Sequence, residues 1–159
     1  MTEERPDLST VIHLREVKDD ETLVQVLREA ETSEERLREQ IAQPVHTSYL
    51  ALMGAEVVGG ATLKWQSDES ELIYIATTPA YRGKGYGKAI ICAVLRLVSE
   101  QGSRSLLVGT GNSSLDTIAF YQKCGFRMDH VRRDYFAYAK SPVWEDGILL
   151  RDMLVFRYS

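Results

Sequence analysis

Three glycines and three cations occupy residues 82–88, directly before the longest amphipathic pattern in the chain. Glycine permits a positive φ and lets main-chain N–H groups converge on a ligand. The first turn of a helix adds unpaired N–H donors and a partial positive charge, and together these favour a phosphate group. The pattern predicts a helix with an anion-binding turn at its start and a stop at Gly102. The residues of this turn are Arg82, Gly83, Lys84, Gly85, Tyr86, Gly87 and Lys88.

Two well-known phosphate motifs do not fit the turn. A dinucleotide fingerprint requires a third glycine where Lys88 stands. A P-loop requires glycine at position 82 and serine or threonine at position 89, which are Arg82 and Ala89 here. A flexible turn without a ligand is the other alternative, and the gathering of glycines and cations at a helix start disfavours it.

The composition indicates one ordinary globular domain over residues 1–159, with residues 1–10 as a flexible N-terminus. The chain is 44% hydrophobic and 26% charged, and its net charge of -4 disfavours nucleic acid and membrane surfaces as partners. No apolar run approaches the roughly 20 residues that span a bilayer. We expect Cys92 and Cys124 to be buried, reduced thiols of a cytoplasmic protein. No His, Cys, Asp or Glu spacing indicates a metal site.

Periodicity along the chain predicts a mixed α/β fold of about seven strands and four helices. Asp19 or Asp20 is expected to cap the first helix, and Thr32 with Glu35 to form a capping box for the second. The predicted strands are 11–17, 48–53, 57–65, 71–77, 105–110, 126–131 and 148–157, with a polar loop at 66–70. The predicted helices follow Asp20, run from Thr32 to before Pro44, follow the glycine turn, and cover 112–124.

Two motifs resemble those of the GNAT acetyltransferases. The pattern Arg-x-x-Gly-x-Gly at Arg82, Gly85 and Gly87 is similar to the pyrophosphate-binding motif of that family. Asn112, followed by Ala-Phe-Tyr-Gln-Lys-Cys-Gly-Phe at 119–126, is similar to its second motif. The resemblance covers residues 71–126. It implies a GNAT fold, with a central mixed seven-stranded sheet, about four flanking helices, and a cofactor cleft between the fourth and fifth strands.

The same resemblance implies an N-acetyltransferase that uses acetyl-CoA without a metal. Main-chain groups of Ile75, Ala76 and Thr77 would bind the pantetheine arm and polarise the thioester carbonyl, and the amides of residues 83–88 would hold the pyrophosphate. Asn112 would bind the pantetheine from the other side. It is also a good N-cap for the helix predicted at 112–124, and that role alone would explain it.

An amine acceptor needs help to lose its proton. An alkylamine has a pKa near 10, so at pH 7 about one molecule in a thousand is neutral, and forming the neutral species costs roughly 4 kcal/mol. By resemblance to histone-type members, Glu71, eleven residues before Arg82, is a candidate base. A solvated charge at a strand end is the alternative, and Glu69 could substitute for Glu71.

Tyr121 matches the tyrosine that commonly serves as general acid in the family, although a packing role is the alternative. A phenol can protonate the leaving thiolate. Direct attack in a ternary complex is simpler than an acyl-enzyme on Cys124, for which nothing indicates a lowered pKa.

The acceptor is predicted to be a primary amine of a small molecule or a protein, bound by residues 20–44 and 130–147. Aromatic residues beside carboxylates could hold a cationic amine, or they could be core residues and a turn. The residues in question are Tyr135, Phe136, Tyr138, Trp144, Glu145 and Asp146. Arg151 and Asp152 could form an internal ion pair. A homodimer through the late strands is implied by resemblance, and a catalytically silent CoA-binding sensor is the alternative function.

Overall fold

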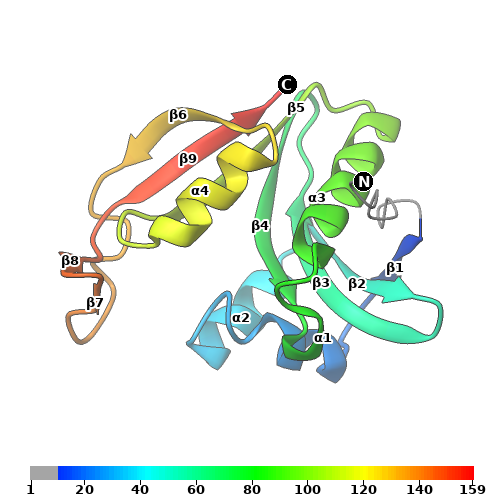
Figure 1. The fold of residues 1–159 in the computed structure, drawn as a ribbon, viewed down its shortest axis with the longest axis horizontal. Helices are drawn as coiled ribbons and strands as arrows, with labels where there is room; N and C mark the ends of the chain where they lie inside the picture. Colours follow the sequence, from blue (N-terminus) through cyan, green and yellow to red (C-terminus); the bar gives the residue numbers. More distant parts are fainter. Residues whose placement is uncertain (1–10) are drawn as a thin grey trace, which may run out of the picture.

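A seven-stranded mixed sheet runs through the computed structural model, which describes residues 11–159 (Figure 1). The N-terminal segment predicted to be flexible, residues 1–10, lies outside the described residues. The strand order is β1-β2-β3-β4-β5-β9-β6, and β4 with β5 is the only parallel pair within the described sheet. The strands are β1 (Ile12–Val17), β2 (His46–Met53), β3 (Glu56–Lys64), β4 (Glu69–Thr77), β5 (Ser105–Gly111), β6 (Arg127–Arg132) and β9 (Met153–Tyr158). A separate two-stranded hairpin consists of β7 (Trp144–Glu145) and β8 (Ile148–Leu149).

In the described part of the chain four α-helices flank the sheet, as predicted, in two pairs on opposite faces. They are α1 (Glu21–Leu27), α2 (Glu34–Ile41), α3 (Tyr86–Glu100) and α4 (Leu115–Lys123). Strand β2 shows the division, because its side chains alternate between two core clusters. Tyr49 and Ala51 pack with α3, whereas Leu50 and Leu52 pack with α1 and α2. The predicted mixed α/β fold class is therefore confirmed.

The helix starts agree with the sequence for α1 and differ by one residue for α2. Asp20 accepts a hydrogen bond from the N–H of Leu23 at 3.0 Å, which confirms one of the two predicted caps. The cap of α2 is Ser33, not Thr32, because the Ser33 hydroxyl accepts from the N–H of Arg36. The predicted N-cap was therefore one residue too early, and the predicted capping box is wrong, because the residue three positions after Ser33 is Arg36.

The predicted polar loop at 66–70 was too long at its C-terminal end. Glu69 and Ser70 belong to β4, where they pair with Ser105 and Leu106 of β5. Ser70 is fully buried, and its hydroxyl bonds the hydroxyl of Ser103 at 2.6 Å. A strand accepts such a polar residue because its hydrogen-bonding group is satisfied.

The predicted strand at 148–157 is broken into β8 and β9. The main chain between them is tied to other elements: Leu150 N–H donates to Val143, and the carbonyl of Arg151 accepts from Phe136. Strand β9 then enters the sheet between β5 and β6. The strand order could not be read from the sequence, because hydrophobic alternation identifies a strand without identifying its neighbours.

Two further expectations concern single residues. Cys92 and Cys124 are free thiols, as predicted, but both are only partly buried. Arg151 and Asp152 do not form the suggested ion pair within the described residues, since Asp152 accepts instead from the N–H of Asp134 at 2.9 Å. No helix in the described part of the chain is long and apolar enough to cross a membrane.

Candidate active site

Strands β4 and β5 separate at the centre of the sheet. Their parallel pairing runs from Glu69 with Ser105 to Leu72 with Val108 and then stops. Residue 73 is inserted in β4, because Leu63 pairs with Leu72 and the next residue of β3, Thr62, pairs with Tyr74. Such a bulge bends a strand and redirects its side chains. Beyond it, residues 74–77 pair with β3 on one side, and no strand within residues 11–159 pairs with them on the side of β5.

A cavity of about 600 Å³ opens where the two strands diverge. One part of its wall comes from the ends of β4 and β5 and from α4, and includes Ile75, Thr77, Gly109 and Tyr121. The other part comes from the segment after α1, from α2 and from residues 132–138. The cavity therefore joins the region predicted for the acyl donor to the region predicted for the acceptor.

Tyr121 lies with its ring in the core and its hydroxyl at the cavity. The residue is 5% exposed, and its ring packs against those of Phe126 and Phe156. The Tyr121 hydroxyl has no hydrogen-bond partner among residues 11–159. Every fully buried side-chain oxygen in these residues does have a partner, so this hydroxyl is not fully buried and reaches the cavity surface. Burial, with a smaller contribution from Cys124, raises the pKa of Tyr121 well above its usual range. The phenol is therefore a proton donor held in a fixed position.

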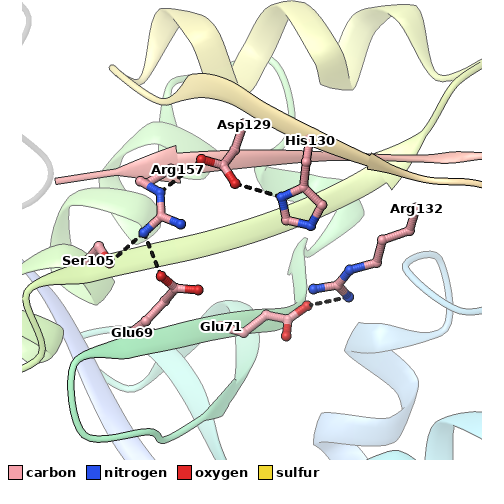
Figure 2. A network of polar contacts seen from close by, with 7 residues as sticks. All are labelled: Glu69, Glu71, Ser105, Asp129, His130, Arg132 and Arg157. Atoms are coloured by element: carbon pink, nitrogen blue, oxygen red, sulfur yellow. Dashed lines mark hydrogen bonds and ion pairs between the residues drawn. The ribbon is translucent and has the colours of Figure 1, made fainter.

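Glu71 faces the same cavity from β4 (Figure 2). Its Oε1 accepts a hydrogen bond from the guanidinium of Arg132 at 3.2 Å, and its side chain is 17% exposed. The alternative of a solvated charge does not describe this carboxylate, which is paired and largely enclosed. Glu69, its suggested substitute, is bonded to Arg157 at 2.6 Å and does not line the cavity.

The glycine turn presents a row of unpaired donors at the start of α3. None of the six main-chain N–H groups of residues 83–88 has a hydrogen-bond partner among residues 11–159. Gly83 and Gly85 have φ of 71° and 88°, values that other residues adopt only with strain, and Gly85 is the N-cap without a side-chain cap. The turn is exposed. It therefore has the donor geometry expected of a site for a phosphate-containing ligand.

The cations of the turn differ in their partners. Lys84 and Lys88 are exposed and form no ion pair within the described residues. Arg82 instead forms an ion pair with Glu29, and its Nε–H donates to the carbonyl of Thr77. Arg82 thus links the turn to the end of β4 and to the segment after α1.

Asn112 does not cap α4, because that helix begins at Leu115 with Ser114 as its N-cap. The side-chain oxygen of Asn112 accepts from the N–H groups of Arg151 and Asp152, at 2.9 and 3.0 Å. Its Nδ2 donates to the carbonyl of Leu149. These bonds satisfy main-chain groups of the β8–β9 connection, so Asn112 holds that connection in place, and Asn112 itself does not line the cavity.

Of the aromatic residues predicted near the acceptor, three line the cavity and one does not. Tyr135, Phe136 and Tyr138 are in its wall, whereas Trp144 is 63% exposed and lies outside it. The alternative of a buried core is therefore wrong for Trp144. The predicted turn is present, since Asp146 and Gly147 connect β7 to β8 with positive φ.

Arg36 of α2 contacts residues of the 132–138 segment in the part of the cavity predicted to bind the acceptor. Its Nε–H donates to Glu31 at 3.2 Å, its guanidinium also donates to the hydroxyl of Tyr135, and its Cζ lies 4.2 Å from the ring centre of Tyr138. A helix of the N-terminal half and a connection of the C-terminal half therefore meet over the cavity.

Comparison with known proteins identifies the family. The profile of the acetyltransferase (GNAT) family matches residues 13–126. This chain belongs to the GNAT family. The match extends over most of the chain and includes both motifs and the strands that open between them.

Relatives of this GNAT member include proteins of known structure. It is 33% identical to the uncharacterized N-acetyltransferase YvbK of Bacillus subtilis over 67% of this chain and 70% of that protein. It is 30% identical to the ribosomal protein bS18-alanine N-acetyltransferase of Escherichia coli, over 52% of this chain and 55% of that protein. A GNAT acetyltransferase of Elizabethkingia anophelis, solved with acetyl-CoA bound, has a TM-score of 0.83 at 27% identity and covers 92% of this chain and 97% of that one. These findings confirm the predicted GNAT fold and acetyltransferase class, and the Elizabethkingia anophelis protein binds acetyl-CoA, the acyl donor predicted here.

Several residues of this GNAT site were not identified from the sequence. Arg36, Lys64, Arg132 and Met153 line the cavity from four separate segments. A charged residue at the end of an apolar strand, such as Lys64, was the one available signal. Within residues 11–159, no group of three or more His, Cys, Asp and Glu could hold a metal ion.

Proposed function

We propose that this protein transfers the acetyl group of acetyl-CoA to a primary amine by direct attack in a ternary complex. The observation that carries the proposal is the row of six unpaired N–H groups at the start of α3, beside the opening between β4 and β5. With the diphosphate bound to these N–H groups, the pantetheine arm would run along β4 into the cavity, which Tyr121 and Glu71 both line.

Main-chain groups of residues 75–77 hold the thioester in this proposal. These residues have no strand partner toward β5 in the described part of the chain, and Ile75, Ala76 and Thr77 all line the cavity. A fixed N–H aimed at the carbonyl oxygen stabilises the oxyanion that forms during attack.

The proton steps are assigned to Glu71 and Tyr121. Glu71 accepts a proton from the ammonium form of the acceptor, directly or through water, and the neutral nitrogen then attacks the carbonyl carbon. The attacking nitrogen of the tetrahedral intermediate then gives its extra proton to solvent. The intermediate collapses, the carbon–sulfur bond breaks, and Tyr121 gives its proton to the departing sulfur, while Glu71 returns the proton it took to solvent. The amide and free coenzyme A leave, and the phenol regains a proton by way of solvent.

An acyl-enzyme on Cys124 is less well supported. Burial is the main cause that raises the pKa of the Cys124 thiol, whereas a nucleophilic cysteine needs a lowered one. Cys124 also does not line the cavity.

The acceptor amine belongs either to a small molecule or to a protein. The Escherichia coli relative is named for acetylating an alanine of a ribosomal protein. The cavity of about 600 Å³ lies within the size range of small-molecule sites, which favours a small acceptor.

The test measures acetyl-CoA binding by calorimetry and free-thiol release across a panel of amines. The proposal expects binding together with amine-dependent thiol release. Binding without any amine-dependent release would support the alternative, a CoA-binding sensor that performs no turnover. If calorimetry detects no heat with acetyl-CoA at about millimolar concentration, the binding free energy is about -4 kcal/mol or weaker. This result would contradict both the enzyme and the sensor.

A further inference from the structure

Among the residues that the structure describes, one cation of the cavity lining has no carboxylate partner. The lining contains the carboxylates Glu29, Glu31 and Glu71 and the cations Arg36, Lys64, Arg82 and Arg132. Each carboxylate is paired with an arginine: Glu29 with Arg82, Glu31 with Arg36, and Glu71 with Arg132. Lys64 forms no ion pair within residues 11–159, and the lining therefore carries an excess of one positive charge.

The position of Lys64 is close to the proposed chemistry. It ends β3 directly opposite Glu71 of β4, and residues paired in this way on one face have Cβ atoms about 4.5–5.5 Å apart. On its other side, Lys64 pairs with His46 of β2. Nδ1 of His46 donates a hydrogen bond to the carbonyl oxygen of Gln40, so this N–H is used within the protein and does not bind the acetyl acceptor.

Arg132 contributes further donors at the same place. One of its N–H groups is used by Glu71, and the guanidinium has five in all. The side chain is 35% exposed and lines the cavity, so the others can reach a ligand. Lys64 and Arg132 therefore reach the cavity from strands on either side of Glu71.

We propose that the acceptor carries a carboxylate within a few bonds of its amine, and that Lys64 and Arg132 bind this carboxylate while Glu71 faces the amine. This inference rests on the proposed transfer of acetyl to an amine. A single negative charge matches the excess of one positive charge, whereas a polyamine would add charges of the wrong sign. The substrate class is thus a small amino acid or another aminocarboxylate.

The test compares free amino acids with the corresponding amino-acid amides, which keep the amine and lose the carboxylate. With acetyl-CoA saturating, kcat/KM for the preferred amino acid should exceed that for its amide by about 10- to 100-fold, because a charged hydrogen bond contributes roughly 1.5–3 kcal/mol. Spermidine should be a poor acceptor. Equal rates for acid and amide, or a preference for spermidine or O-phosphoethanolamine, would overturn the inference.

Lys64→Met should reduce the selectivity ratio between acid and amide to near one, mainly through KM for the acid, and Lys64→Arg should restore much of it. Lys123→Met is the control, because Lys123 is exposed on α4 and lies outside the cavity lining. An unchanged ratio in Lys64→Met would also overturn the inference.

The failure of this inference can be distinguished from that of the proposed function. If the protein acetylates amides and polyamines but not amino acids, the proposed acetyltransferase function stands and the carboxylate site is rejected. Calorimetry of the same amino acids on the protein loaded with coenzyme A reports acceptor binding without turnover. Absence of both turnover and binding for the whole amino-acid panel would reject the carboxylate site even if acetyl-CoA binds.

Discussion

At the scale of single residues, the position of Tyr121 is compatible with packing and with the proposed catalytic role at the same time. Its ring contributes to the core, and its hydroxyl is the part that reaches the cavity. A sequence pattern cannot separate these two uses of one side chain, because each requires a tyrosine at the same position. The structure makes the hydroxyl testable by itself, since phenylalanine retains the ring.

We predict that Tyr121→Phe lowers kcat by roughly 10²- to 10⁴-fold, the usual contribution of general acid catalysis, with little change in acetyl-CoA affinity. Steady-state thiol release and calorimetry give the two quantities. Tyr49→Phe is the matched control, because Tyr49 is similarly buried, at 8% exposed, and lies outside the cavity lining. If the Tyr121 variant turns over at the normal rate, the tyrosine is only a packing residue.

The pH profile should reflect the raised pKa of Tyr121. Because burial favours the neutral phenol, the proton donor stays protonated at and above the ordinary tyrosine pKa of about 10. We therefore expect kcat to rise with pH as the acceptor loses its proton, without a decrease between about pH 8 and pH 10. A measured kcat profile that falls in this window and loses its fall in Tyr121→Phe would contradict the assignment.

At the scale of elements, the glycine turn and α3 were predictable because their signals are local. The positions that require glycine, the cations, and the helical repeat all lie within one stretch of sequence. The insertion of β9 between β5 and β6 was not predictable, since it depends on contacts between residues distant in the sequence. The same holds for Asn112, whose partners are 37 to 40 residues further along the chain. Arg132 and Lys64 join Glu71 for this reason too, and the acceptor site is accordingly the part that the sequence left open.

Gly83→Ala tests the turn as an element. Gly83 has a φ of 71° and open space where a β-carbon would stand, as does Gly54, whose φ is 61°, in the β2–β3 connection. Alanine at either position costs about 1–2 kcal/mol from its left-handed backbone. We predict a similar loss of stability in both variants by denaturant unfolding, but a loss of acetyl-CoA affinity of about tenfold or more only for Gly83→Ala. Equal affinities in the two variants would show that the turn does not hold the ligand.

At the scale of the whole molecule, an acidic protein has to bind a ligand that carries several phosphates. The net charge is -4, so the overall field opposes the ligand and the local arrangement at the start of α3 has to overcome it. In the proposed site, main-chain N–H groups would do this without adding net charge, and Lys84 with Lys88 adds two exposed cations beside them. Salt screens the exposed charges of the two lysines, whereas the main-chain N–H groups carry no net charge to be screened.

Acetyl-CoA affinity should therefore weaken only several-fold between about 0.01 and 0.5 M salt, as the contribution of the two lysines is screened. Lys84→Gln with Lys88→Gln should weaken binding at low salt and largely remove this dependence, which calorimetry at both salt concentrations can measure. At 100 times its Kd, acetyl-CoA should stabilise the fold by about 2.7 kcal/mol, which raises Tm by roughly 5–11 °C for a chain of this size. The double variant should show the same rise once the ligand is again at 100 times its own, weaker Kd, because the stabilisation depends on that ratio alone. If the double variant kept the full salt dependence, the ligand's phosphates would have to lie elsewhere than at the start of α3.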